Sequence, residues 1–223
     1  MDQWIQSWDL ALKDKETSDY SVGQVWARKG AEFYLVDSVR GHFSIQEVID
    51  HIRRLTGRYP QAVAKVIEDK AMGPVVKAML DKEVPGIIPY DPKGSKRSRV
   101  AVVEPVLAAG NIYVPQNPDG TQEDWVKDFV EECAQFDKGA YDDQVDALAQ
   151  SIIFMLPAGW INIAKQHQEA IARGVPTKST EEMLIAQVHA ELRKDINKHG
   201  RKLVNKQGNV FSRIYNRHRA HRW

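Results

Sequence analysis

The stretch Trp4-Ile-Gln-Ser-Trp-Asp-Leu-Ala-Leu12 decides the fold, because the rest of the chain can be arranged around it. Its aromatic and aliphatic residues, without Pro or Gly, predict a buried strand that ends at a polar turn over residues 13–19. Asp9 stands inside this apolar run, where a carboxylate loses hydration energy unless it is paired or binds a cation. Two hypotheses stay open for Asp9: a strand-edge side chain that faces solvent or pairs with a lysine, and a cation ligand.

Two more strands follow the first one directly. Residues 21–27 and 32–38 have the composition of strands, and the four residues between them contain Gly30. This pattern predicts a hairpin, so the domain begins as an antiparallel meander of three strands.

The chain then changes to alternating helices and strands. Ser44 and Glu47 match a capping box, which predicts a helix that stops near Gly57. Residues 62–69 predict a parallel strand reached through this crossover helix. We therefore expect an α/β fold with a mixed sheet, in which three antiparallel strands continue into parallel strands flanked by helices. Later helices are expected over residues 73–82, 100–107, 122–134 and 141–156, and short strands over residues 86–90 and 111–115.

Composition excludes several classes of protein. A chain of 223 residues with 43% hydrophobic and 27% charged residues is ordinary for a soluble globular protein. No apolar run approaches the ~20 residues of a membrane helix, so we expect no membrane partner. The single cysteine, Cys133, excludes an internal disulfide and a multi-cysteine zinc site.

Charge divides the chain into two regions. Residues 158–223 contain 13 Lys and Arg against 5 Asp and Glu, a formal charge of +8, which leaves residues 1–157 at −7. We expect residues 1–157 to form the folded domain and residues 158–223 a basic C-terminal extension. Residues 179–192 predict a helix within this extension, which is expected to be helical or partly disordered.

Three acidic positions that are far apart in sequence fall at element ends that the predicted fold brings together. Glu68 and Asp69 end the fourth predicted strand, and Asp143 and Asp146 lie three apart at the start of the last predicted helix. If the fourth strand lies parallel to the first, Glu68 or Asp69 comes close to Asp9. Mutual repulsion makes such a cluster unfavourable, and a divalent cation relieves it. Oxygen ligands without Cys or paired His suit Mg²⁺ or Mn²⁺.

The sequence also contains five motifs in a fixed order. These are Trp8-Asp-Leu-Ala-Leu-Lys13 with Asp19-Tyr-Ser-Val22, Val66-Ile-Glu-Asp-Lys-Ala-Met-Gly73, Lys93-Gly-Ser-Lys-Arg-Ser-Arg99, Ala108-Ala-Gly-Asn-Ile-Tyr-Val-Pro115 and Asp142-Asp-Gln-Val-Asp-Ala-Leu148. Together they resemble the C-terminal nuclease domain of the large terminase subunit of tailed double-stranded-DNA bacteriophages. The resemblance covers about residues 1–157. It implies an RNase H-like fold and a two-metal endonuclease that cuts concatemeric viral DNA during genome packaging.

The resemblance also implies roles for single residues. Asp9 matches the aspartate of the first strand that ligates both metal ions, Mg²⁺ or Mn²⁺. Asp69 or Glu68 matches the second acidic position, and Asp69 is preferred. Asp146 matches the acidic residue of the last motif, and Asp143 is a further ligand there.

A basic loop is expected to contact DNA. Lys93, Lys96, Arg97 and Arg99 match a region near the DNA backbone in the family, where they would contact phosphates without reading sequence. The alternative is a solvated run of charge before a helix.

Partners and location follow from the resemblance too. The family implies double-stranded DNA as substrate and, as further partners, the ATPase domain of the full-length subunit, the portal and the small terminase subunit. It implies the host cell cytoplasm as location, with a transient stay on the procapsid. The chain contains no G-x-x-x-x-G-K-[ST] loop, so we expect no ATP hydrolysis here.

Two other functions stay open. A nuclease of the same fold that resolves Holliday junctions would carry the same carboxylates. A DNA-binding or assembly module with structural carboxylates would bind DNA without cleaving it.

Overall fold

The computed structural model describes residues 1–11, 20–70, 72–157 and 210–213. The predicted turn over residues 13–19 and the predicted helix over residues 179–192 lie outside these residues. The elements are β1 (Gln3–Asp9), β2 (Ser21–Lys29), β3 (Glu32–Gly41), α1 (Ile45–Arg58), β4 (Ala64–Glu68), α2 (Gly73–Leu80), β5 (Ile87–Tyr90), α3 (Lys96–Ala108), β6 (Ile112–Gln116), α4 (Asp124–Gln135), α5 (Asp143–Met155) and β7 (Val210–Arg213).

One mixed sheet runs through the molecule in the strand order β5-β4-β1-β2-β3-β6-β7. Strands β1, β2 and β3 are antiparallel neighbours, and β4 lies parallel to β1 on one side. Strand β5 continues parallel to β4, and β6 lies parallel to β3 on the other side. The predicted α/β fold, with an antiparallel meander that continues into parallel strands, is confirmed.

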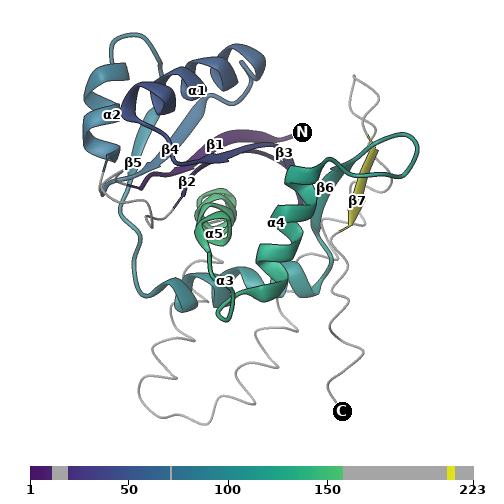
Figure 1. The fold of residues 1–223 in the computed structure, drawn as a ribbon. Helices are drawn as coiled ribbons and strands as arrows, with labels where there is room; N and C mark the ends of the chain where they lie inside the picture. Colours follow the sequence, from purple (N-terminus) through teal and green to yellow (C-terminus); the bar gives the residue numbers. More distant parts are fainter. Residues whose placement is uncertain (12–19, 71, 158–209, 214–223) are drawn as a thin grey trace.

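Helices cover both faces of this sheet (Figure 1). Helices α1 and α2 lie on one face, and α3, α4 and α5 lie on the other, with α5 directly against the central strands. Each face has its own apolar core. Trp8 and Ile49 belong to the core beneath α1 and α2, whereas Trp26, Phe129 and Ile152 belong to the core beneath α3, α4 and α5. Burying side chains of this size stabilises the fold by about 1.5–3 kcal/mol each.

The first helix follows the predicted capping pattern. Ser44 caps α1 by accepting a hydrogen bond from the Glu47 backbone N–H, and the Glu47 side chain accepts from the Ser44 N–H in return. The helix buries Val48, Ile49 and Ile52 against the sheet. Its position places β4 beside β1, and this pairing decides where the acidic residues meet.

A tryptophan and a glycine fix the pairing of β1 and β2. Trp8 is fully buried and stands opposite Gly23 in the antiparallel ladder. A Cβ atom on Gly23 would lie 2.3 Å from the Trp8 ring, so the ring occupies the space that any other residue would fill. This close contact favours the observed register of β1 and β2, in which Asp9 stands opposite Val22.

The structure differs from the sequence-based expectation at three places. Strand β1 ends at Asp9 instead of Leu12, because the Ala11 N–H donates to the Ser21 hydroxyl at 3.1 Å and leaves the sheet ladder. The end of the basic segment expected to be a loop is helical, because Ser95 caps α3 and the helix begins at Lys96. Within the extension expected to be helical or partly disordered, the described residues form strand β7, which pairs antiparallel with β6.

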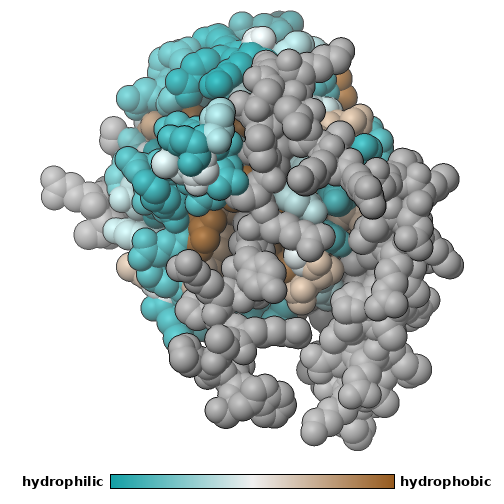
Figure 2. All heavy atoms as spheres, turned by 90° about the vertical axis from the view of Figure 1, so that its right-hand side faces the viewer, coloured by the Kyte–Doolittle hydropathy of each residue, from teal (hydrophilic) through white to brown (hydrophobic). Residues whose placement is uncertain are grey.

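The described surface on the right-hand side of Figure 1 is mostly hydrophilic, and hydrophobic side chains occupy only small areas of it (Figure 2). None of the helices in the described part of the chain combines the length and the apolar character needed to cross a bilayer.

Candidate active site

Two carboxylates meet where β1 and β4 end. The strands are parallel and in register from Ile5 opposite Ala64 to Trp8 opposite Ile67. One step further along this register, Asp9 stands beside Glu68, and their side chains form a hydrogen bond. Because carboxyl ends of parallel strands lie at the same edge of a sheet, the pairing itself brings these two acids together.

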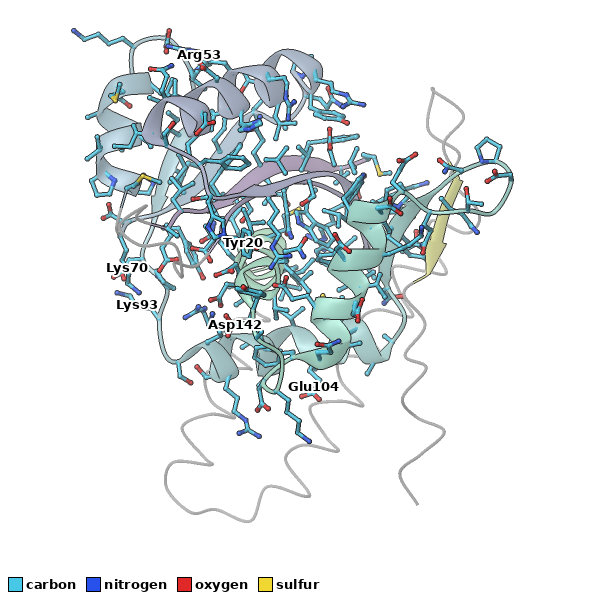
Figure 3. All side chains as sticks on the ribbon, viewed as in Figure 1. Tyr20, Arg53, Lys70, Lys93, Glu104 and Asp142 are labelled. Carbon is cyan, nitrogen blue, oxygen red and sulfur yellow. The ribbon has the colours of Figure 1, made fainter. Side chains whose placement is uncertain are left out.

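Helix α5 adds two more carboxylates at this edge. Asp143 and Asp146 lie in its first turn and are 5% and 8% exposed. The Asp143 carboxylate accepts a hydrogen bond from the Tyr20 backbone N–H at 3.1 Å, which ties the helix to the start of β2. Figure 3 shows Tyr20, Lys70, Lys93 and Asp142 on this side of the molecule, whereas Arg53 and Glu104 lie away from it.

The charges of these four acids act on one another. Burial, then the charges of Glu68, Asp146 and Asp143, raise the pKa of Asp9 well above the usual value of a carboxyl group. A raised carboxyl pKa means that the surroundings disfavour the ionised form. A bound cation has the opposite effect, and an all-oxygen donor set is the one that hard divalent cations prefer. The donor set therefore fits such a cation.

Asp69 does not take part in this arrangement. Its side chain is exposed, and it is not among the charges that raise the pKa of Asp9. The next residue, Lys70, instead pairs with Glu68 at 3.1 Å. The structure thus places Glu68, and not the preferred Asp69, next to Asp9.

Basic side chains from α3 occupy the oxygens of the α5 carboxylates. Lys96 Nζ lies 2.5 Å from an Asp142 oxygen and 2.7 Å from Asp146 Oδ2. Arg99 Nη2 lies 2.5 Å from Asp146 Oδ1. With the side chains placed in this way, no group of three or more His, Cys, Asp or Glu in the described residues is arranged to hold a metal ion. The acids are neighbours, but Asp146 is turned to α3.

The four residues expected to contact DNA therefore fall into two pairs. Lys96 and Arg99 bond to the acidic cluster, and their side chains are 33% and 11% exposed. Lys93 and Arg97 are 85% and 83% exposed. Lys93 pairs with Asp91 and Arg97 pairs with Asp137, so both stand on the surface beside the cluster.

Sequence reasoning missed the residue that attaches α5 to the sheet. The Gln150 side-chain amide lies one helical turn beyond Asp146 and is 4% exposed. It donates hydrogen bonds to the Ser7 hydroxyl at 2.9 Å, to the Trp8 carbonyl at 3.3 Å and to the Val66 carbonyl at 3.2 Å. It therefore joins β1, β4 and α5 directly beneath the carboxylates. A polar side chain within an apolar helical stretch was the signal for it.

We expect Gln150→Ala to lower the free energy of unfolding by about 3 kcal/mol, because it removes a buried amide whose two N–H bonds serve three acceptors, and it leaves a cavity. Denaturant unfolding followed by circular dichroism measures the change. Gln135→Ala is the matched control, since Gln135 is exposed on α4 and its side chain bonds to Glu131 within the same helix. Equal stability of the two variants would contradict the structural role of Gln150.

A second buried residue supports the beginning of α5. The side chain of Asp142, the residue before the helix, does not cap it. Instead Glu132 from α4 accepts from the Gln144 backbone N–H at 2.7 Å, and Arg40 neutralises Glu132 at 3.3 Å. Because Glu132 accepts in place of the Asp142 side chain, Asp142 is available to pair with Lys96. The carboxylate-bearing turn is thus held by α4 and β3 together.

Comparison with known proteins decides the family. The family model described as the terminase RNase H-like domain matches residues 6–154.

The chain belongs to the terminase RNase H-like domain family. The match contains Asp9, Glu68, Asp143 and Asp146, so the whole acidic cluster lies inside the family's domain. The resemblance to a terminase nuclease domain and the RNase H-like fold inferred from the five motifs are confirmed.

The chain is also similar to several solved structures. The large terminase nuclease from thermophilic phage G20c with bound zinc aligns with a TM-score of 0.50 and 18% sequence identity, over 66% of this chain and 78% of that chain. The same nuclease with bound magnesium aligns with a TM-score of 0.44 and 18% identity, over 66% and 79%. The fowlpox virus Holliday junction resolvase aligns with a TM-score of 0.42 and 13% identity, over 69% and 97%. Among curated proteins, none matches the chain.

Proposed function

We propose that this terminase domain is a divalent-metal-dependent endonuclease that cleaves concatemeric viral double-stranded DNA during genome packaging. One observation carries the proposal. Carboxylates from β1, β4 and α5 act on one another at one edge of an RNase H-like sheet, and they raise the pKa of Asp9 well above its usual value. Carboxylates placed in this way would hold divalent cations, and these cations would bind the phosphate of the DNA backbone.

The residues that would hold the metal are Asp9, Glu68, Asp143 and Asp146, with Asp9 central to the set because all three others act on it. When bound, two Mg²⁺ or Mn²⁺ ions would supply an activated water and neutralise the charge on the phosphodiester. The protein would contribute the positions of the carboxylates through Gln150, Tyr20 and the β1–β4 register. The G20c nuclease, which has the same fold, was solved with bound zinc, and this agrees with a divalent site here.

Basic surface residues beside the cluster would bind the DNA backbone. Lys93 and Arg97 are highly exposed, and Lys70 is 61% exposed next to Glu68. Contacts of this kind give affinity that falls with salt and does not depend on sequence. The ends of the cut would be 3′-hydroxyl and 5′-phosphate.

The place of the domain in the virus follows from the family. We propose residues 1–157 as the nuclease domain and residues 158–223 as a basic extension, with the ATPase activity residing elsewhere in the full-length subunit. Its partners would be that ATPase domain, the portal and the small terminase subunit. It would act in the host cytoplasm, transiently on the procapsid.

Supercoiled plasmid tests the proposal. We expect nicked and then linear DNA with Mg²⁺ or Mn²⁺, and no cleavage with excess EDTA. Mn²⁺ at about 100 times its dissociation constant should also stabilise the fold by about 2.7 kcal/mol, which raises the melting temperature by about 5–10 °C in a domain of this size. DNA binding without cleavage, and melting that is insensitive to Mn²⁺, would instead favour an assembly module. Faster cleavage of four-way junctions than of linear duplex would favour a resolvase.

A further inference from the structure

The beginning of α3 carries positive charge where a helix disfavours it. Lys96, Arg97 and Arg99 lie in its first turn, at the positive end of the helix dipole, and the turn holds no acidic residue. Acidic side chains from outside the helix compensate this arrangement. Asp142 and Asp146 face Lys96 and Arg99, and Asp137 faces Arg97.

The ion pairs of Lys96 and Arg99 differ from the pair of Arg97 with Asp137 in solvent access. Arg99 and Asp146 are 11% and 10% exposed, so water and salt screen their attraction little. Arg97 is 83% exposed, and its contact with Asp137 is longer, at 3.4 Å. A solvent-exposed pair of that kind contributes little. The same turn therefore carries one shielded cation, Arg99, one partly exposed cation, Lys96, and one highly exposed cation, Arg97.

Asp146 has both of its oxygens engaged by these cations. Oδ2 lies 2.7 Å from Lys96 Nζ, and Oδ1 lies 2.5 Å from Arg99 Nη2. A divalent cation that uses Asp146 as a ligand meets two positive groups at the same carboxylate, and their repulsion weakens its binding. Metal binding and these ion pairs therefore oppose each other.

We propose that Lys96 and Arg99 are internal counter-ions that compete with divalent cations for Asp146 and, once displaced, bind the DNA phosphate beside the cluster. The inference rests on the proposed function, since it concerns the same site. The displaced side chains lie on α3 next to the acids, so a phosphate held there would be within their reach. Metal and DNA then strengthen each other's binding. The metal replaces the two cations at Asp146, and the DNA phosphate becomes the new partner of the displaced cations. A domain without DNA would hold its metal more weakly.

Titration with Mn²⁺ alone tests the competition. We compare wild type with Lys96→Met and Arg99→Met, because methionine keeps much of the apolar stem and removes the charge. Each should lower the Mn²⁺ dissociation constant, measured by calorimetry, by about fivefold, the size expected for one partly shielded ion pair. Arg97→Met, which removes an equal charge from the same turn, should change it less than twofold. Lys96 is 33% exposed, so its variant is the one expected to fold with least disturbance.

Binding to a short DNA duplex tests the second role. In EDTA, Lys96→Met and Arg99→Met should bind the duplex as wild type does, because the wild-type side chains are engaged with Asp146. With Ca²⁺, which occupies oxygen sites in place of Mg²⁺, wild type should bind several-fold more tightly, and both variants should lose most of this gain. Arg97→Met should weaken binding equally in both conditions.

The outcomes separate this inference from the proposed function. Wild type that binds no Mn²⁺ and cleaves no DNA would overturn the nuclease assignment itself. Wild type that binds Mn²⁺ and cleaves DNA, with Lys96→Met and Arg99→Met matching Arg97→Met in their Mn²⁺ dissociation constants, would overturn only the counter-ion role. If the two variants bind the duplex more weakly than wild type in EDTA as well as in Ca²⁺, Lys96 and Arg99 face DNA whether or not metal is bound. This result would also overturn the counter-ion role.

Discussion

Replacing Asp9 by asparagine is expected to reduce the rate of plasmid nicking by about a thousandfold. Removal of a single group that stabilises the transition state lowers the rate of other enzymes by up to this factor. Asp9 is the acid on which Glu68, Asp143 and Asp146 all act, so it is the position that shares any cation with each of them. An amide keeps the size of the side chain and can donate to Glu68, but it carries no charge to attract the metal.

The same change is expected to leave the protein at least as stable as wild type. Burial and three neighbouring acids raise the pKa of Asp9, so ionised Asp9 costs folding energy at neutral pH, and a neutral side chain does not. Asp9→Asn should therefore melt at the same or a higher temperature without metal, and Mn²⁺ should raise this temperature less than in wild type.

Plasmid nicking and thermal melting with and without Mn²⁺ are the measurements. Asp50→Asn is the control, because Asp50 is exposed on α1 and pairs with Arg53, away from the cluster. Nicking by Asp9→Asn at the wild-type rate would refute the assignment. A clearly lower melting temperature would show that Asp9 stabilises the fold, contrary to the reasoning from its raised pKa.

The fold could be predicted because local signals and long-range pairing agree. The capping box at Ser44, the glycine turn at Gly30 and the apolar run of β1 each define an element from its own residues. A helix between two strands then favours a parallel pairing, and the structure places β4 beside β1. From the sequence alone, the approach of Asp9 to the end of β4 followed only on the condition of this pairing.

The choice between Glu68 and Asp69 was beyond sequence reasoning for a physical reason. Strand β4 is covered on both faces, and its residues Val66 and Ile67 are both fully or almost fully buried, one in each core. Apolar residues thus point to both faces, so the sequence does not tell which residues face α5. The register with β1 supplies that information, and it places Glu68 on the face of Val66.

The basic segment was predicted to be a loop, and the three cations in the first turn of α3 do oppose the helix dipole. The compensating acids lie far later in the chain, on α5 and the segment before it. Local sequence therefore carried no sign of them. Gln150 was missed for a related reason, since its three acceptors come from β1 and β4, which are distant in sequence.

Glu68→Gln and Asp69→Asn, two neighbouring changes of the same kind, are expected to differ about a hundredfold in nicking rate. Glu68 bonds with Asp9 and lies on the α5 side of the sheet, whereas Asp69 is exposed and interacts with Tyr90 through its backbone N–H. Losing a metal-binding carboxylate should cost about two orders of magnitude, at the upper end of what changes near a metal ligand cost. An exposed carboxylate that touches neither metal nor substrate should cost less than about threefold.

Single-turnover cleavage of plasmid at several Mn²⁺ concentrations distinguishes a ligand from a residue that only supports the fold. Glu68→Gln should require more Mn²⁺ and remain slower at saturation, and its melting temperature should respond less to Mn²⁺. Asp69→Asn should follow the wild-type curve in both measurements. The reverse result, with Asp69→Asn inactive and Glu68→Gln nearly normal, would mean that β4 turns its other face to the metal, and that the side chains at the end of β4 rearrange when the cation binds.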